Sequence, residues 1–254
     1  MKQLLMGVVM LWNNLLLADG LSQVISGYDF LSPEMQAIQD DDFLNPGMSA
    51  VEDGHALFVA ADEEGRACAD CHGESADKLD QQKIAAYPLY SSRYEKMLTL
   101  QEQVHACWTD NLDRFPLLYD DPKLLKLETF VRYKARGQPI NVKKDPRIEA
   151  MYTLGKQLYE QRFGQVGMTC HQCHITYQGQ YLRGSKLTQG QTNGFPVYRF
   201  KSDRLTSLHR RFNECFVQLR ATPYEVGSEE YRALEYYMAT LSNGLTVETP
   251  GVRH

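Results

Sequence analysis

Two short motifs combine cysteine and histidine at a spacing suited to covalent chemistry. One is Cys68-Ala69-Asp70-Cys71-His72, and the other, about a hundred residues later, is Cys170-His171-Gln172-Cys173-His174. A C-x-x-C-H sequence attaches c-type haem through two thioether bonds and supplies a histidine to the iron. A thioredoxin-like redox pair would explain one C-x-x-C, but two copies, each followed by histidine, favour haem. We therefore expect two covalently bound haem c groups, with His72 and His174 as proximal ligands. The attachment residues would be Cys68, Cys71, Cys170 and Cys173.

The ligand on the other side of each iron must come from elsewhere in the chain, as methionine, histidine or thiolate. Counted forward from the proximal histidines, the best match is His105 with His209, at 33 and 35 residues. Counted back from Glu128 and Glu235, the best match is Cys107 with Cys215, at 21 and 20 residues. No two methionines correspond. A Cys107–Cys215 disulfide or two inert thiols would also account for the spare cysteines. The candidate ligands are Met97, His105, Cys107, His209, Cys215 and Met238.

Positive charge gathers around Cys215, although the formal net charge of the chain is -5. On a helix, Arg211 would share a face with Cys215, because the two are four residues apart. A neighbouring guanidinium lowers the pKa of a thiol and can bind an oxyanion through two hydrogen bonds. The alternative is a solvated basic face without a ligand. The basic residues here are Arg199, Lys201, Arg204, His209, Arg210, Arg211 and Arg220.

A helix is predicted before each motif, which indicates an internal duplication. The first opens with a capping box from Ser49 to Glu52 and ends near Gly65. The second opens at Asp145, with proline at the next position, and ends near Gly164. The motif cysteines follow each helix directly.

A further helix closes each half of the chain. One runs from Asp121 towards Gly137, and the other from Ser228 towards Gly244. The 40 or more residues between each motif and its closing helix are predicted to be long loops that cover a ligand, with residues 179–201 as the least periodic stretch. The predicted fold is mainly α, with two tandem cytochrome c-like domains and long loops. The division is a signal peptide at 1–20, an N-terminal arm at 21–47, a first haem domain at 48–140, and a second haem domain with the active site at 141–254.

The first twenty residues have the layout of a secretory signal peptide. Lys2 precedes an apolar stretch from Leu4 to Trp12, and Asn13 interrupts it well short of the roughly 20 residues that span a bilayer. Export to the periplasm is expected, with no membrane attachment after cleavage; an uncleaved anchor is the alternative. No long basic run occurs, so a nucleic-acid partner is not expected.

The second half closely resembles the SoxA family, the haem subunits of the SoxAX complex of bacterial thiosulfate oxidation. The resemblance extends through Glu248 to Arg253 and covers nearly the whole mature chain. It rests on Met168 to His174, Leu182-Arg183-Gly184, Gln189-Gly190, Asn193 to Arg199, Ser207 to Arg211, and Cys215.

The resemblance implies an exported sulfur-transfer oxidoreductase that forms a heterodimer with a monohaem SoxX-like cytochrome. It would conjugate thiosulfate oxidatively to a cysteine of a SoxYZ-like carrier protein and pass the electrons to c-type haem, an L-cysteine S-thiosulfotransferase activity. By position, Cys107 and Cys215 match the thiolate ligands of the family. Cys215 also matches the catalytic cysteine, found in the family as a persulfide, and Arg211 the catalytic arginine.

This chain departs from the family pattern in its closing helix. Family members often have an arginine there that faces the site, whereas this chain reads Met238 to Asn243 without one. A second basic contact to the substrate would then come from Arg204 or Arg220, or be absent. Two other functions stay open: a pure dihaem electron carrier, with histidine or methionine opposite each iron, and a dihaem peroxidase, which needs one exchangeable position.

Overall fold

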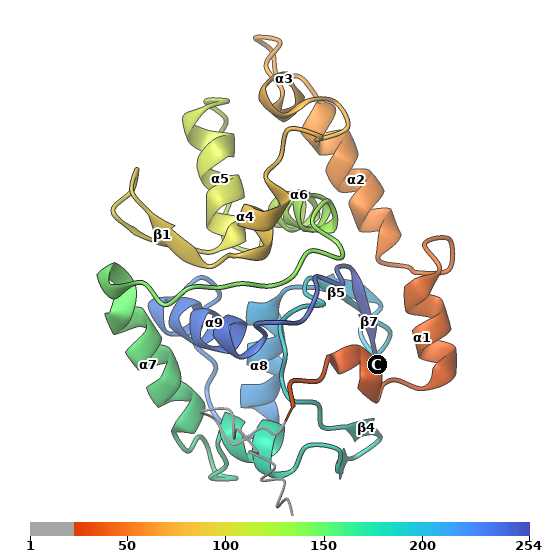
Figure 1. Cartoon of the computed structure of the whole chain (residues 1–254), viewed down its shortest axis with the longest axis vertical. Helices are drawn as coiled ribbons and strands as arrows, with labels where there is room; N and C mark the ends of the chain where they lie inside the picture. The colour runs from red at the N-terminus through yellow and green to blue at the C-terminus, as the bar shows by residue number, and fades with distance from the viewer. Residues whose placement is uncertain (1–22) are drawn as a thin grey trace, which may run out of the picture.

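Each half of the chain is built on a pair of closely packed helices (Figure 1). In this computed structural model, which describes residues 23–254, α2 (Met48–Val59) packs against α6 (Pro122–Tyr133), and α7 (Glu149–Glu160) packs against α9 (Glu229–Leu241). Both pairs close over a glycine. A Cβ at Gly54 would lie 2.2 Å from a carbonyl oxygen of α6, and one at Gly155 would lie 2.0 Å from a carbonyl oxygen of α9. The same contact therefore occurs twice, as the predicted duplication requires.

The predicted helix starts are largely confirmed. Asp121 caps α6 and Ser228 caps α9, each accepting a hydrogen bond from a backbone N–H of the first turn. Asp145 caps a 3-10 turn, η2 (Pro146–Ile148), which leads into α7. The predicted capping box at Ser49 is wrong. Helix α2 begins one residue earlier, and the Ser49 hydroxyl donates to the carbonyl of Pro46 instead.

The first helix is also shorter than predicted. It ends at Val59 rather than near Gly65, because Asp62 organises the next segment as a turn. The Asp62 carboxylate accepts hydrogen bonds from the backbone N–H groups of Glu64 and Arg66. This turn leads the chain to the first C-x-x-C-H motif.

The segments predicted to be long loops contain short strands, with two further helices in the first half and one in the second. Antiparallel strands precede a helix in both. In the second half, the first strand of the hairpin before the helix (197–199) also pairs in parallel with the last strand of the chain (251–253), which makes a three-stranded sheet. Residues 179–201 are therefore more regular than expected. In the first half the elements are α3 (Cys68–His72), α4 (Gln81–Ala85), β1 (Leu89–Ser91), β2 (Lys96–Leu98) and α5 (Leu100–Asp110). In the second half they are the π-helical turn η3 (Gln172–Thr176), β3 (Tyr181–Leu182), β4 (Ser185–Lys186), β5 (Val197–Arg199), β6 (Arg204–Thr206), α8 (Leu208–Gln218) and β7 (Gly251–Arg253).

Each half has its own apolar core, and a third cluster joins them. We call residues 48–140 the first module and 141–254 the second, bounds that stay a prediction. Phe58 and Phe130 pack in the core of the first module, and Phe216 and Tyr231 in that of the second. The joining cluster combines residues of both modules. The architecture is thus mainly α with two similar units, as predicted.

The segment predicted as an N-terminal arm folds onto the second module. It holds a 3-10 turn, η1 (Gly27–Phe30), and α1 (Pro33–Asp40), which lies beside β7 (Figure 1). The Ser26 hydroxyl donates to Glu248 at 2.8 Å, and Gln39 accepts from the backbone of Val252 at 2.9 Å. The predicted signal peptide, residues 1–20, lies outside the described residues. Within residues 23–254, no helix is long and apolar enough to cross a membrane.

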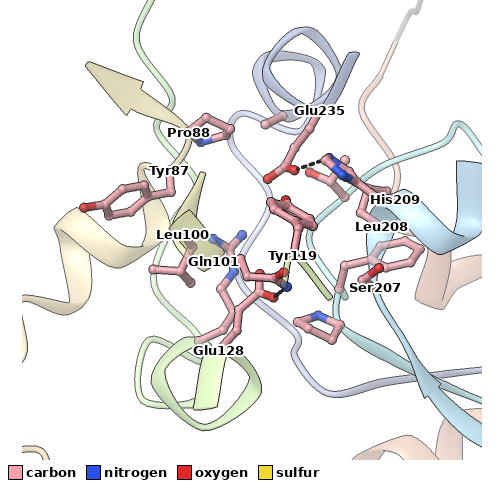
Figure 2. A pocket seen from close by; sticks show the side chains of 15 residues that line it. Tyr87, Pro88, Leu100, Gln101, Tyr119, Glu128, Ser207, Leu208, His209 and Glu235 are labelled. Atoms are coloured by element: carbon pink, nitrogen blue, oxygen red, sulfur yellow. Dashed lines mark hydrogen bonds and ion pairs between the residues drawn. The ribbon is translucent and has the colours of Figure 1, made fainter. Parts of the chain in front are cut away.

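A polar cavity of about 40 Å³ lies between the modules. Gln101 of the first module donates to Glu128 at 2.6 Å, and His209 of the second pairs with Glu235 at 3.0 Å. Figure 2 shows Tyr119 between these two pairs, and its ring stacks on His209 with the centroids 4.7 Å apart. Burial raises the pKa of Glu128 to about 8 against the lowering effect of Gln101, and the charge of Glu235 raises it further. The interface therefore contains a carboxyl group that prefers to keep its proton.

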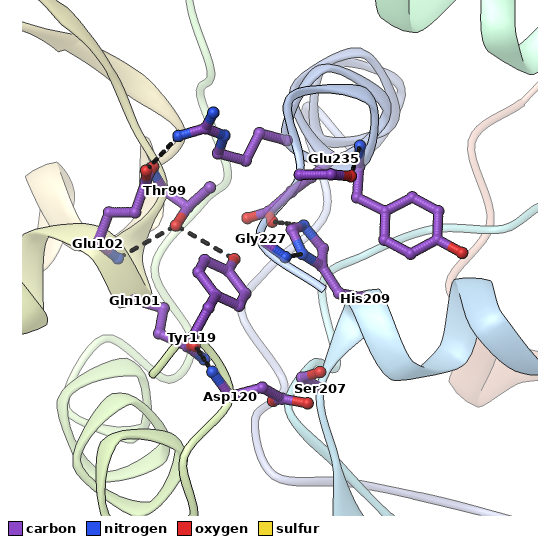
Figure 3. Close-up of polar contacts among 12 residues, drawn as sticks. Thr99, Gln101, Glu102, Tyr119, Asp120, Ser207, His209, Gly227 and Glu235 are labelled. Carbon is purple, nitrogen blue, oxygen red and sulfur yellow. Dashed lines mark hydrogen bonds and ion pairs between the residues drawn. The ribbon is translucent and has the colours of Figure 1, made fainter. Parts of the chain in front are cut away.

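Polar contacts at the mouth of this cavity bind the modules together (Figure 3). The Arg232 guanidinium of α9 meets Glu102 of α5 at 2.8 Å. Arg210 of α8 is ion-paired with the buried Asp120. The backbone N–H of Gly227 donates to Nδ1 of His209 at 3.0 Å. This histidine is therefore buried in the interface, where Nδ1 accepts from Gly227 and Nε2 lies 3.0 Å from Glu235.

Candidate functional site

In the second module, α8 brings Cys215 to the C-x-x-C-H motif. Burial raises the pKa of Cys170 to about 12, and the neighbouring Cys215 contributes to this rise. The pKa of Cys173 is raised for the same two reasons. The His174 ring hydrogen-bonds the Cys215 thiol. Three thiols and one imidazole, separated by up to 45 residues in sequence, therefore meet at one place.

The His174 ring is held by the loop that follows the motif. Its Nδ1 lies 2.8 Å from the carbonyl oxygen of Thr188, which fixes the proton on Nδ1 and leaves Nε2 free to ligate. The same loop passes so close that a Cβ at Gly190 would lie 2.9 Å from the ring. Gly190 has φ +75, a conformation that also favours glycine. The loop thus fixes the orientation of the His174 imidazole.

The first module repeats this grouping. Burial raises the pKa of Cys68 to about 11, opposed by the positive charge of Arg114 and reinforced by the nearby Cys107 and Cys71. Burial also lowers the pKa of His72, because it disfavours the charged ring. All six cysteines are free. The alternative of a Cys107–Cys215 disulfide is therefore wrong, since each of these thiols lies beside the motif of its own module.

The structure shows which residues of the two modules occupy equivalent positions: Cys107 with Cys215, or His105 with His209. Helices α5 and α8 each follow a two-stranded hairpin, and Cys107 and Cys215 each occupy the eighth residue of their helix. His105 is the sixth residue of α5, and its Nε2 accepts a hydrogen bond from the backbone of Leu117 at 3.3 Å. His209 is the second residue of α8 and lies in the module interface. The two cysteines correspond in the fold, and the two histidines do not.

The two methionine candidates lie in apolar cores. Met97 is 5% exposed and belongs to the cluster that joins the modules. Met238 is 6% exposed and packs in the core of the second module. Three thiols and one imidazole therefore gather at each motif, a set of groups that would suit a c-type haem with histidine–thiolate ligation.

The surroundings of Cys215 are positively charged, as the sequence predicted. Arg211 and Cys215 share one face of α8, four residues apart. Burial alone raises the pKa of the Cys215 thiol, but Arg211 and the His174 ring lower it, with a net value of about 7. With a pKa of about 7, a substantial fraction of this thiol is ionised at neutral pH, which suits a nucleophile or a ligand.

A carboxylate and a second arginine complete this site. Glu214 accepts a hydrogen bond from Arg211 at 3.0 Å and lies 3.4 Å from Nε of Arg199, which β5 supplies. Arg204 and Arg220, the expected sources of a second basic contact, are both exposed. Glu214 lies three residues after Arg211, a helical spacing that could have indicated this pair, but its contact with Arg199 could not be read from spacing. Nothing in the sequence distinguished Arg199 among the seven basic residues near Cys215. Its position on β5 is what brings it to Glu214.

Comparison with known proteins agrees with the fold and the motifs. Residues 53–140 and 154–247 match the SoxA/TsdA cytochrome c domain family. The chain is 38% identical over 239 residues to the L-cysteine S-thiosulfotransferase subunit SoxA of Rhodovulum sulfidophilum, which covers 94% of this chain and 83% of that protein. It is 33% identical over 243 residues to the subunit of the same name from Paracoccus pantotrophus, covering 94% and 82%.

A solved structure is similar over almost the full length. The crystal structure of SoxXA from P. pantotrophus superimposes with a TM-score of 0.86 at 31% identity, covering 93% of this chain and 89% of that one. The chain has two tandem helical units with a C-x-x-C-H motif in each, and its relatives agree with this arrangement. The chain belongs to the SoxA family and carries two cytochrome c domains.

Proposed function

We propose that this chain is the catalytic subunit of an L-cysteine S-thiosulfotransferase. It would join a SoxX-like monohaem cytochrome in a heterodimer and act with thiosulfate on a cysteine of a SoxYZ-like carrier protein. The relatives of that name, similar over more than nine-tenths of this chain, support the activity. The SoxXA structure supports the cytochrome partner. The signal-like N-terminus and the haem attachment motifs support the periplasm as location.

The observation that carries the proposal is the thiol of Cys215 between Arg211 and His174. Arg211 provides a guanidinium for the sulfonate oxygens of thiosulfate, whose planar N–H groups suit an oxyanion. The same charge favours the ionised form of Cys215, so its sulfur can form an S–S bond with the outer sulfur of the substrate. We place both residues in the catalytic site.

The overall reaction balances as an oxidation of two sulfur atoms. The carrier thiol and thiosulfate form one S–S bond, giving a cysteine S-thiosulfonate, one proton and two electrons. In the scheme we favour, Cys215 takes up the thiosulfonate group first, with loss of the two electrons. The carrier thiolate then attacks the outer sulfur, and Cys215 leaves as a thiolate stabilised by Arg211. Arg211 thus serves both the binding and the leaving-group step.

Two haem c groups would be held by the donor sets described above. Cys68 and Cys71 would attach the first, and His72 and Cys107 would hold its iron. The second would have the equivalent residues Cys170, Cys173, His174 and Cys215. When bound, c-type haem supplies a one-electron acceptor and a route towards the partner cytochrome. The hydrogen bond from His174 to Thr188 would orient the ring for ligation.

The alternative of a pure dihaem electron carrier is less well supported. It needs histidine or methionine opposite each iron, whereas His209 is buried at the module interface and Met97 and Met238 lie in apolar cores. It also gives no reason for the two arginines that surround Glu214 beside Cys215. A dihaem peroxidase would need one iron with an exchangeable ligand, and histidine–thiolate ligation at both motifs would leave none.

The test compares Cys215→Ala with the wild type in the complete complex. Low-temperature EPR of the oxidised protein should show low-spin signals with the narrow g-spread of histidine–thiolate ligation, and the variant should lose one of them. Thiosulfate turnover with the carrier should be lost as well. Cys107→Ala should remove the other EPR signal, and Gln218→Ala, an exposed position on α8, should remove neither. Wide bis-histidine signals that survive Cys215→Ala with turnover intact would refute the proposal.

A further inference from the structure

Three arginines lie in one row of the sheet formed by β6, β5 and β7. The strand register places Arg199 opposite Arg204 on one side and opposite Arg253 on the other. Residues paired in this way direct their side chains to the same face, so like charges there repel. Arg253 is satisfied by Gln39 at 2.7 Å and by its own strand, and Arg204 is exposed to water. Arg199, on the middle strand, has neither a full set of hydrogen-bond acceptors nor full exposure to water.

The Arg199 side chain is only 12% exposed and incompletely satisfied. Its Nε lies within ion-pair distance of Glu214 but has no hydrogen-bond acceptor among residues 23–254. Burial lowers the pKa of Arg199, and the positive charge of Arg211 lowers it further. A buried guanidinium N–H without a hydrogen-bond acceptor is costly unless a ligand supplies one. Its surroundings therefore favour an anion at this position.

Charge and location identify the class of anion. Arg199 and Arg211 carry two positive charges against the single carboxylate that they share, Glu214. The excess positive charge lies beside the Cys215 thiol, because the charges of both arginines act on that sulfur. Two guanidinium groups can together offer hydrogen bonds to more than one oxygen of a small dianion. A sulfur oxyanion with a terminal sulfur would place that sulfur towards Cys215.

We propose that Arg199 is a second substrate-binding arginine, which acts with Arg211 on the sulfonate group of thiosulfate. The inference rests on the proposed function of the Cys215 site. It assigns to β5 the second basic contact that the closing helix α9 lacks. Glu214 accepts from one nitrogen of Arg211 and lies 3.4 Å from Nε of Arg199, so it holds the two guanidiniums near each other and leaves the Nε–H of Arg199 without an acceptor, available to the substrate.

The test uses Arg199→Gln and Arg199→Lys in the complete complex, with Arg204→Gln as the matched control from the same row of the sheet. Thiosulfate binding is measured by calorimetry without the carrier, and turnover with it. We expect Arg199→Gln to weaken thiosulfate binding about tenfold, the effect of about 1.4 kcal/mol. KM should rise more than kcat falls, and Arg199→Lys should recover part of the affinity. Arg204→Gln should stay within about twofold, because solvent and salt screen its exposed charge.

The outcomes separate this inference from the function on which it rests. If Arg211→Gln weakens thiosulfate binding and Arg199→Gln does not, Arg199 has no part in binding and the inference is overturned while the function stands. If neither variant changes binding and Cys215→Ala keeps turnover, the proposed function fails too. Equal losses in Arg199→Gln and Arg204→Gln would indicate general attraction of anions rather than contact, and would also overturn the inference. Unchanged circular dichroism and haem absorbance of Arg199→Lys show that the fold is intact.

Discussion

Replacing Glu128 by glutamine should change how the stability of this protein depends on pH. Glu128 lines the cavity between the modules and has a pKa raised from 4.5 to about 8, because burial disfavours its charge and Glu235 is close. Gln101, Asp120 and Arg132 also face it. Glutamine has nearly the same shape and stays neutral, and its side-chain oxygen can accept the same hydrogen bond from Gln101.

The sign follows from proton binding in the two states. Between pH 4.5 and pH 8 the folded protein keeps a proton on Glu128 that the unfolded chain has lost, so stability falls as pH rises. Each pH unit costs about 1.4 kcal/mol, and the total over this window is roughly 3 to 5 kcal/mol. The loss is complete above the folded pKa. Glu128→Gln should therefore resemble the wild type near pH 5 and be more stable than it at pH 8.5.

Urea unfolding of both proteins at half-unit steps from pH 5 to pH 9 measures this difference, with circular dichroism and haem absorbance as independent probes. Glu52→Gln, an exposed carboxylate of α2, is the control and should follow the wild type at every pH. Parallel pH profiles for Glu128→Gln and the wild type would refute the argument, because Glu128 would then titrate alike in both states. A variant that is already more stable than the wild type by the full amount of roughly 3 to 5 kcal/mol at pH 5 would equally contradict it.

Three further predictions concern packing, ligation and the module interface. Gly155→Ala should lower stability by about 3 kcal/mol and the thermal midpoint by several degrees, because the added Cβ would meet a backbone oxygen at 2.0 Å. Gly184→Ala, where no atom lies within 4 Å of the added Cβ, is the control and should be neutral. Equal midpoints of the two variants would contradict this prediction. Cys107→Met should raise one haem reduction potential in a redox titration, since methionine gives less electron density than thiolate, and unchanged potentials would argue against Cys107 as ligand. A double-mutant cycle on the partly buried Arg232–Glu102 pair should give a coupling energy of about 1 kcal/mol. The exposed pair of Lys126 with Asp53 should give less than about 0.5 kcal/mol. The reverse order would refute the role of burial.

Local spacing determined much of this protein before any tertiary structure. The two C-x-x-C-H motifs, the caps at Asp121 and Ser228, and the shared face of Arg211 and Cys215 all depend on residues at most four positions apart. Over so few residues the helix or the motif itself fixes the geometry. The capping box at Ser49 failed, although it too is local, because α2 starts one residue earlier.

Only the tertiary structure decided which side chains meet across long separations. Counting residues could not choose between His105 with His209 and Cys107 with Cys215, because the segments in between differ in length between the modules. The hairpin before α5 and α8 sets a common starting point, and from it the cysteines agree. Arg199 reaches Glu214 only because β5 packs beside α8, a contact that residue spacing does not encode.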